Sequence, residues 1–168
     1  MRITIAQGPF LPVPPIMGGA IEKLFVPLGQ LWASWGHTVT HVSRSHPDLP
    51  DAEVISGVRH VRVRSHDATS SGLVNKWLDL RYALNVRQEL LRLPPADILV
   101  THTFFLPIVA NRPDHHGRVY VHAARFPKGQ YPLYLRAERL QFCSETIRRA
   151  ALAQTPWLAS RMTVIPNE

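Results

Sequence analysis

Short apolar runs alternate with longer stretches of mixed apolar and polar residues along most of the chain. The near-continuous apolar runs are typical of strands buried on both faces, and they lie at residues 2–7, 38–43, 97–102 and 118–122. The mixed stretches repeat apolar residues at helical spacing and predict helices at residues 19–35, 73–93 and 145–153. Strands separated by helices predict an α/β fold in which helices cover both faces of a parallel sheet.

Weaker patterns predict the remaining elements. Residues 58–63 alternate apolar and polar side chains, which predicts a half-exposed strand with Arg59, Arg62 and Arg64 on a solvated face. Short helices are predicted at residues 104–110 and 133–138, short strands at 140–144 and from Met162 onward, and polar loops at 45–51 and 66–72. Ser144 precedes the last helix, where a serine side chain can cap the first backbone N–H groups.

A pair of glycines, Gly18 and Gly19, stands between the first strand and the first helix. Because glycine has no Cβ, the backbone here can approach a ligand closely, and the N–H groups at the helix start favour an anion such as phosphate. A tight turn that binds nothing would leave the same pattern. In a ligand site, Gly19→Val should lower activity and leave the fold intact, because the loop is predicted to lie outside the core.

Polar residues stand where the predicted strands end. His102 and Thr103 end one strand, and His122, Arg125 and Lys128 end the next. Ligands of α/β proteins bind beyond the carboxyl ends of parallel strands, so these residues form the candidate site. A lone histidine at a strand end is more often a structural hydrogen-bonding group than a catalyst. Its combination with a glycine turn and two cations favours a ligand site.

Composition limits the partners. The chain has 168 residues, enough for one domain with one core, and a formal net charge of +7. That charge favours a phosphate-bearing ligand, an anionic lipid surface or nucleic acid. Nucleic acid is the weakest of these, because the arginines form no dense run interleaved with aromatic residues. No apolar run of about 18 residues exists, so no membrane span is predicted.

Other chemistries find little support in the motifs. His115 and His116 lie in a Pro-Asp-His-His-Gly turn without a second ligand pair at metal-binding spacing, so no metal site is predicted. No nucleophile elbow surrounds Cys143 or Ser144. The glycine-rich fingerprint of dinucleotide-binding enzymes is missing. Cys143 is the single cysteine, which excludes a disulfide within the chain.

Several motifs, in order along the chain, resemble the family-four glycosyltransferases of GT-B fold. These motifs are Gly18-Gly19-Ala20-Ile21-Glu22, Gly36-His37-Thr38-Val39, Asp97 to His102, Val119-Tyr120-Val121-His122, Phe142-Cys143-Ser144-Glu145 and Val164-Ile165-Pro166-Asn167. The fourth motif ends at the position of that family's active-site histidine. Two positions depart from the family pattern: Pro27 interrupts the first helix, and Glu168 replaces the glycine that usually follows Pro-Asn.

The resemblance implies a Rossmann-like domain over residues 1–168, one half of a GT-B fold, with the donor-binding C-terminal domain absent from this chain. It implies a retaining glycosyltransferase of hexosyltransferase type that moves a sugar from a nucleotide sugar to an acceptor hydroxyl without a metal or other cofactor. His122 is then catalytic, and the substrate-binding residues are Gly18, Gly19, Glu22, His102, Thr103, Arg125 and Lys128. We expect this chain alone to be inactive without a donor-binding domain or subunit.

The resemblance also implies an acceptor that is a sugar, a lipid-linked molecule or another small molecule. The single cysteine and the lack of a recognisable secretory signal favour a cytoplasmic location. The positive charge, with Trp77, Arg81, Arg87 and Arg92 along one predicted helix, predicts peripheral contact at the inner face of the membrane, and a solvated basic surface would leave the same pattern. Two other functions stay open at this point. One is a non-catalytic partner subunit of a separate transferase, and the other is an unrelated phosphate- or nucleotide-binding α/β module.

Overall fold

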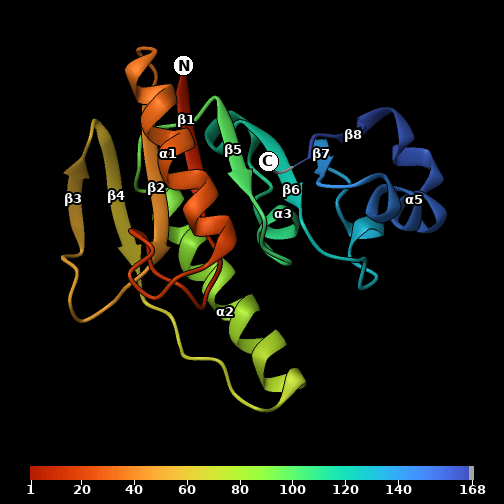
Figure 1. Ribbon diagram of the computed structural model, residues 1–168, viewed down its shortest axis with the longest axis horizontal. Coiled ribbons are helices and arrows are strands. Elements are labelled where there is room, and N and C mark those ends of the chain that lie inside the picture. The colour runs from red at the N-terminus through yellow and green to blue at the C-terminus, as the bar shows by residue number, and fades with distance from the viewer. Residues whose placement is uncertain (167–168) are drawn as a thin grey trace.

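The computed structural model describes residues 1–166 of the chain. Within them, eight strands form one sheet in the order β3-β4-β2-β1-β5-β6-β7-β8 (Figure 1). Every pairing between these strands is parallel except that of β3 with β4. The predicted Rossmann-like α/β class with a parallel sheet is therefore confirmed.

The boundaries follow the hydrophobic pattern closely in the first half of the chain. The strands are β1 (Arg2–Ala6), β2 (Thr38–Arg44), β3 (Ala52–Ile55), β4 (Val58–Val63), β5 (Ile98–Thr101), β6 (Arg118–Ala123), β7 (Ala137–Phe142) and β8 (Met162–Val164). The α-helices are α1 (Ala20–Ser34), α2 (Gly72–Leu90), α3 (Leu106–Val109), α4 (Pro113–His116) and α5 (Glu145–Gln154). There are also two 3₁₀ segments. η1 (Tyr131–Leu133) precedes β7, and η2 (Pro156–Arg161) lies between α5 and β8.

Alternate residues of each central strand point to opposite faces of the sheet, and each face has its own apolar core. One core packs Ile3, Ile5, Val39 and Val100 against Phe25 of α1. The other core joins residues of α2, α3 and α5 to the opposite face, among them Val42, Tyr82, Leu99, Leu140 and Ile147. In Figure 1, α1 crosses in front of the sheet and α2 lies behind it. Helices on both faces, as predicted, are confirmed.

The end of α1 shows how local sequence sets a boundary. Gly36 has a φ of 85°, the left-handed conformation that glycine adopts without strain. Its N–H donates to the carbonyl of Ala33, and the N–H of His37 donates to the carbonyl of Trp32, at 3.0 and 3.1 Å. These two bonds form a Schellman cap and turn the chain directly into β2. The helix continues through Pro27.

The outer part of the sheet differs from the sequence prediction. Residues 52–55 form β3, which pairs with β4 through a hairpin whose turn residues Ser56 and Gly57 have φ values of 49° and 79°. Ser-Gly between two short apolar runs is a hairpin signal that the pattern analysis passed over. The prediction that Arg62 lies on a solvated face is wrong. Its guanidinium is buried, pairs with the Glu53 carboxylate and donates to the Val13 carbonyl at 2.9 Å.

The segment before α5 also differs from the sequence prediction. The helix predicted at residues 133–138 is absent from the described structure: η1 covers only Tyr131–Leu133, and β7 already begins at Ala137. Tyr131 and Tyr134 are buried, so their apolar spacing reflects packing under β7 rather than a helix. Ser144 caps α5 as predicted, since its Oγ accepts the Ile147 N–H at 3.3 Å. The predicted Pro-Asn turn continues into Asn167 and Glu168, which lie outside the described residues.

Candidate functional site

Two histidines meet at the carboxyl edge of the sheet. His102 follows β5, His122 lies near the end of β6, and these two strands are neighbours in the sheet. Both rings pack against Phe25 of α1, with ring centroids 6.5 Å away for His102 and 5.4 Å away for His122. The fold therefore brings together two of the predicted site residues that are 20 positions apart in the sequence.

His102 is held in a narrow space. A Cβ on Gly8, in the loop after β1, would stand 3.1 Å from its Nε2, so a larger residue at position 8 would press on the ring. Its Nδ1 is buried and bonds to no group among the described residues. Burial, with the nearby His122 and the charge of Arg125, lowers the pKa of His102 to about 3. The ring is therefore neutral at physiological pH.

His122 is buried as well, and burial lowers its pKa below the ordinary value of 6.5. Its Nε2 finds no hydrogen-bond partner within residues 1–166. Gln141 stands beside it on β7, and the Gln141 Oε1 accepts a hydrogen bond from the Tyr120 hydroxyl at 3.1 Å. A neutral imidazole whose Nε2 makes no hydrogen bond can exchange one with a polar ligand through that nitrogen.

Glu22 and Arg125 belong to the same region. Glu22, in the first turn of α1, is 5% exposed, and burial raises the pKa of its carboxyl while its own backbone N–H and the charge of Arg125 lower it. Arg125 lies in the exposed loop after β6 and also acts on the pKa of His102. Lys128 is exposed in the same loop, where its backbone N–H donates to the Gln130 side chain at 2.6 Å.

The two glycines occupy different environments. Gly18 has a φ of 84°, its N–H donates to the Pro15 carbonyl at 3.0 Å, and no heavy atom lies within 4 Å of where a Cβ would be. Gly19 has a φ of 107°, and a Cβ there would collide with the Glu22 carboxylate and lie 2.7 Å from Leu11 Cδ1. Gly19→Val would strain the backbone at this φ and force the Glu22 and Leu11 side chains to shift, so we expect it to lower stability as well as activity. Gly18 is the position at which an added Cβ would enter open space.

Thr103 serves the fold. Its Oγ1 lies 3.1 Å from the Thr101 Oγ1 and accepts the Leu106 N–H at 3.3 Å, while its carbonyl accepts from the Tyr134 hydroxyl at 3.3 Å. These bonds connect β5 to α3 and to the segment after η1. Thr103 is 5% exposed, and its hydroxyl is already used in hydrogen bonds within the protein.

A polar pair on α2, on the opposite face of the sheet, was not predicted from the sequence. The Asp79 Oδ1 and the Tyr82 hydroxyl, one turn apart on α2, are buried and have no hydrogen-bond partner among the described residues. Burial raises the pKa of Asp79 to about 6. Burial also raises the pKa of Tyr82, which is close enough to respond to the charges of Asp79 and Glu22. An acidic residue among apolar positions of a predicted helix was the available signal.

Within residues 1–166, the structure offers neither a metal site nor a membrane span. No grouping of three or more histidine, cysteine, aspartate or glutamate side chains there could hold a metal ion. No helix there is long and apolar enough to cross a bilayer.

No family model and no curated protein sequence matches this chain. Solved structures do match it. Sucrose-phosphate synthase from Thermosynechococcus elongatus has a TM-score of 0.70 at 15% identity, over 99% of this chain and 48% of that one. A second chain of that organism's sucrose-phosphate synthase has a TM-score of 0.62 at 13% identity, over 100% of this chain and 90% of that one. A glycosyltransferase from Rickettsia africae ESF-5 has a TM-score of 0.59 at 14% identity, over 99% of this chain and 43% of that one.

This chain has the fold of solved glycosyltransferases. The likeness runs over nearly all of its residues, so it concerns the whole sheet and its helices rather than a local motif. The chain spans about half the length of two of these three matches. At identities of 13–15% the likeness establishes the fold.

Proposed function

We propose that this chain is the acceptor-binding half of a retaining glycosyltransferase of the family-four, GT-B type. The observation that carries the proposal is the pair of neutral histidines, His102 and His122, packed against Phe25 at the carboxyl edge. That edge is where folds of this class bind ligands. The fold likeness to glycosyltransferases selects sugar transfer among the reactions that such an edge can support.

His122 contacts the transferred sugar or the acceptor. Its ring stays uncharged near neutral pH because burial lowers its pKa, and its Nε2 has no partner within the described protein. A sugar hydroxyl supplies the missing partner. A hydrogen bond made in the transition state lowers the barrier only when the protein fixes its geometry in advance, and the packing of His122 against Phe25 provides that rigidity.

The leaving diphosphate is stabilised by groups at the start of α1 and in the loop after β6. The bond between the sugar and the diphosphate breaks as the acceptor oxygen bonds to the sugar, and negative charge develops on the leaving phosphate. The N–H groups at a helix start have no partners within the helix and favour an anion. Arg125 adds a full positive charge, and Lys128 lies in the same exposed loop. No metal is required in this arrangement.

A second domain or subunit completes the enzyme. The chain spans 48% and 43% of the sucrose-phosphate synthase and Rickettsia glycosyltransferase chains, which leaves the remainder of those chains for other parts. We assign donor binding to such a part and acceptor binding to this chain. The acceptor is a sugar, a lipid-linked molecule or another small molecule. The enzyme works in the cytoplasm, in peripheral contact with the inner face of the membrane.

The test uses the complete transferase, in which this chain acts with its donor-binding domain or subunit. His122→Gln should lower the turnover per folded molecule by about a hundredfold or more, the usual loss for a positioned group at a developing charge. His116→Gln is the matched control, because His116 is equally buried but lies in α4, outside the candidate site. Turnover and melting temperature are measured on both variants. Equal losses in the two variants would remove His122 from the active site.

A further inference from the structure

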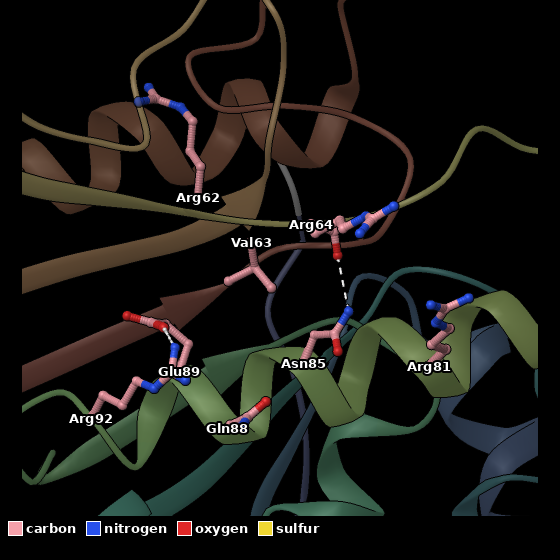
Figure 2. A pocket seen from close by; sticks show the side chains of 8 residues that line it. All are labelled: Arg62, Val63, Arg64, Arg81, Asn85, Gln88, Glu89 and Arg92. Atoms are coloured by element: carbon pink, nitrogen blue, oxygen red, sulfur yellow. Dashed lines mark hydrogen bonds and ion pairs between the residues drawn. The ribbon is translucent and has the colours of Figure 1, made fainter.

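A second polar recess lies apart from the histidine pair, between the end of β4 and α2. It has a volume of about 350 Å³. Its wall is formed by Arg64 at the end of β4 and by Arg81, Asn85, Gln88, Glu89 and Arg92 along and just beyond α2 (Figure 2). Residues 81, 85 and 88 of α2 are spaced four and three apart, so they lie on one face of the helix, and Arg92 follows just beyond its C-terminal end.

Positive charge dominates this recess. Arg64 and Arg81 are exposed, and neither pairs with a carboxylate among residues 1–166. Arg92 pairs with Glu89 at 3.3 Å. The guanidinium of Arg62 turns away from the recess in Figure 2 and is occupied by Glu53, so it does not contribute. The recess is therefore lined by three arginines outside the Arg62–Glu53 pair and by one carboxylate, Glu89, which pairs with Arg92.

The recess is also held in shape. The Asn85 Nδ2 donates to the Arg64 carbonyl at 3.1 Å and so connects the end of β4 to α2 (Figure 2). The Arg81 guanidinium carbon lies 5.6 Å from the centre of the Trp77 ring, a cation–π distance that limits its movement. Val63 is buried at the floor, and its apolar side chain fixes the spacing between strand and helix.

We propose that this recess binds a phosphate group. Guanidinium groups match phosphate oxygens with paired N–H donors, and a phosphate carries the charge and the acceptor oxygens to engage several of them at once. A ligand with a single carboxylate carries less negative charge than a phosphate and offers fewer acceptor oxygens to the three arginines. The phosphate belongs either to a soluble phosphorylated molecule or to a phospholipid head group. This site is separate from the histidine pair and does not depend on the proposed sugar transfer.

The experiment measures binding of phosphate to the 168-residue chain and its variants. Inorganic phosphate and glycerol phosphate are titrated and followed by phosphorus NMR, and vesicles of phosphatidylglycerol or phosphatidylcholine are tested by co-sedimentation. The double variant Arg64→Gln/Arg81→Gln should lower the affinity at least about tenfold. The matched control, Arg59→Gln/Arg118→Gln, removes two exposed arginines outside the recess and should change the affinity less than about twofold.

Glu89→Gln supplies a test in the opposite direction. It removes the one carboxylate of the recess and releases Arg92, so phosphate affinity should rise a few-fold. A response to the soluble phosphates identifies a soluble ligand, and a response only to phosphatidylglycerol vesicles identifies a lipid head group. Either response supports the site if it depends on Arg64 and Arg81. Absence of all binding, or equal losses in the double variant and its control, would overturn it.

Discussion

Gly18 and Gly19 are adjacent in the sequence, yet their surroundings predict different consequences of substitution. Both have positive φ values, which strain any residue with a Cβ. At Gly19 a methyl group would also meet the Glu22 carboxylate and Leu11, whereas at Gly18 it would enter open space. The strain at Gly18 is therefore conformational, and the strain at Gly19 includes a collision inside the protein.

We expect Gly19→Ala to lower the free energy of unfolding by about 1–3 kcal/mol, and by clearly more than Gly18→Ala. If Gly18 lines the proposed ligand site, Gly18→Ala in the complete transferase should lower turnover more than its small loss of folded protein explains, because its methyl group would enter the open space beside the backbone. Chemical denaturation and turnover on both variants check this. Equal destabilisation by the two variants would contradict the described packing at Gly19.

Asp79 shows how burial makes a single residue sensitive to pH. Its pKa is raised from the ordinary 3.8 to about 6, so the folded protein binds a proton there more tightly than the unfolded chain does. The favourable contribution of Asp79 protonation to the free energy of unfolding is complete below about pH 4 and is lost as the pH rises through about 6. Asp79→Asn should then stabilise the protein at pH 7, by at most about 3 kcal/mol.

The measurement for Asp79 is thermal unfolding of wild type and Asp79→Asn from pH 4 to pH 8. The melting temperatures of the two proteins should converge at the acidic end, separate between about pH 4 and pH 6, and stay apart by a constant amount above that. Asp51→Asn is the control, because Asp51 is exposed and forms no ion pair among the described residues, so its substitution should not reproduce that separation. A constant difference between wild type and Asp79→Asn across the range would mean that Asp79 is not the titrating group.

At the scale of elements, the two halves of α2 have different surroundings. Its C-terminal half packs through Tyr82, Val86 and Leu90 under the sheet, while its N-terminal half extends beyond the carboxyl ends of the strands in Figure 1. That extension exposes Leu73, Val74 and Trp77 beside Lys76 and Arg81. Apolar and basic side chains together at a helix tip favour an anionic lipid surface.

We expect the chain to co-sediment with phosphatidylglycerol vesicles at low salt and to be released as salt screens the charges. The double variant Leu73→Ser/Trp77→Ser should lose most of this binding. Trp35→Ser is the matched control: Trp35 is 63% exposed against 58% for Trp77, but it follows α1 at the other end of the sheet. If vesicle binding survives unchanged in the double variant, α2 is not the contact.

At the scale of the whole molecule, the sheet brings the candidate site residues to one edge. Its carboxyl edge brings together His102, His122 and Glu22. This chain matches 48% of the T. elongatus chain and 43% of the Rickettsia africae chain, so both solved chains contain further residues outside the match. We expect the isolated 168-residue chain to give no measurable sugar transfer and only weak nucleotide-sugar binding. Release of nucleoside diphosphate from a panel of nucleotide sugars checks this, and robust turnover by the chain alone would contradict the proposed division of labour.

The sequence by itself determined the elements whose signals are local. Apolar runs placed β1, β2, β5 and β6, because a strand buried on both faces needs an unbroken run of apolar residues. Gly36 and Ser144 set the end of α1 and the start of α5 through backbone geometry and capping, which need no distant partner. The position of the candidate site followed from strand order, since parallel strands end at the same edge.

Tertiary structure decided what depends on distant neighbours. Arg62 is buried because Glu53 and the Val13 carbonyl satisfy its guanidinium, and no local pattern reveals partners 9 and 49 residues away. Thr103 is used inside the fold, and Gly19 is closed by Glu22 and Leu11. His102 and His122 are neighbours because β5 pairs with β6, and burial, in packing that includes Phe25 of α1, lowers the pKa of both rings. Burial and pairing are properties of three-dimensional contact, which residue spacing alone cannot specify.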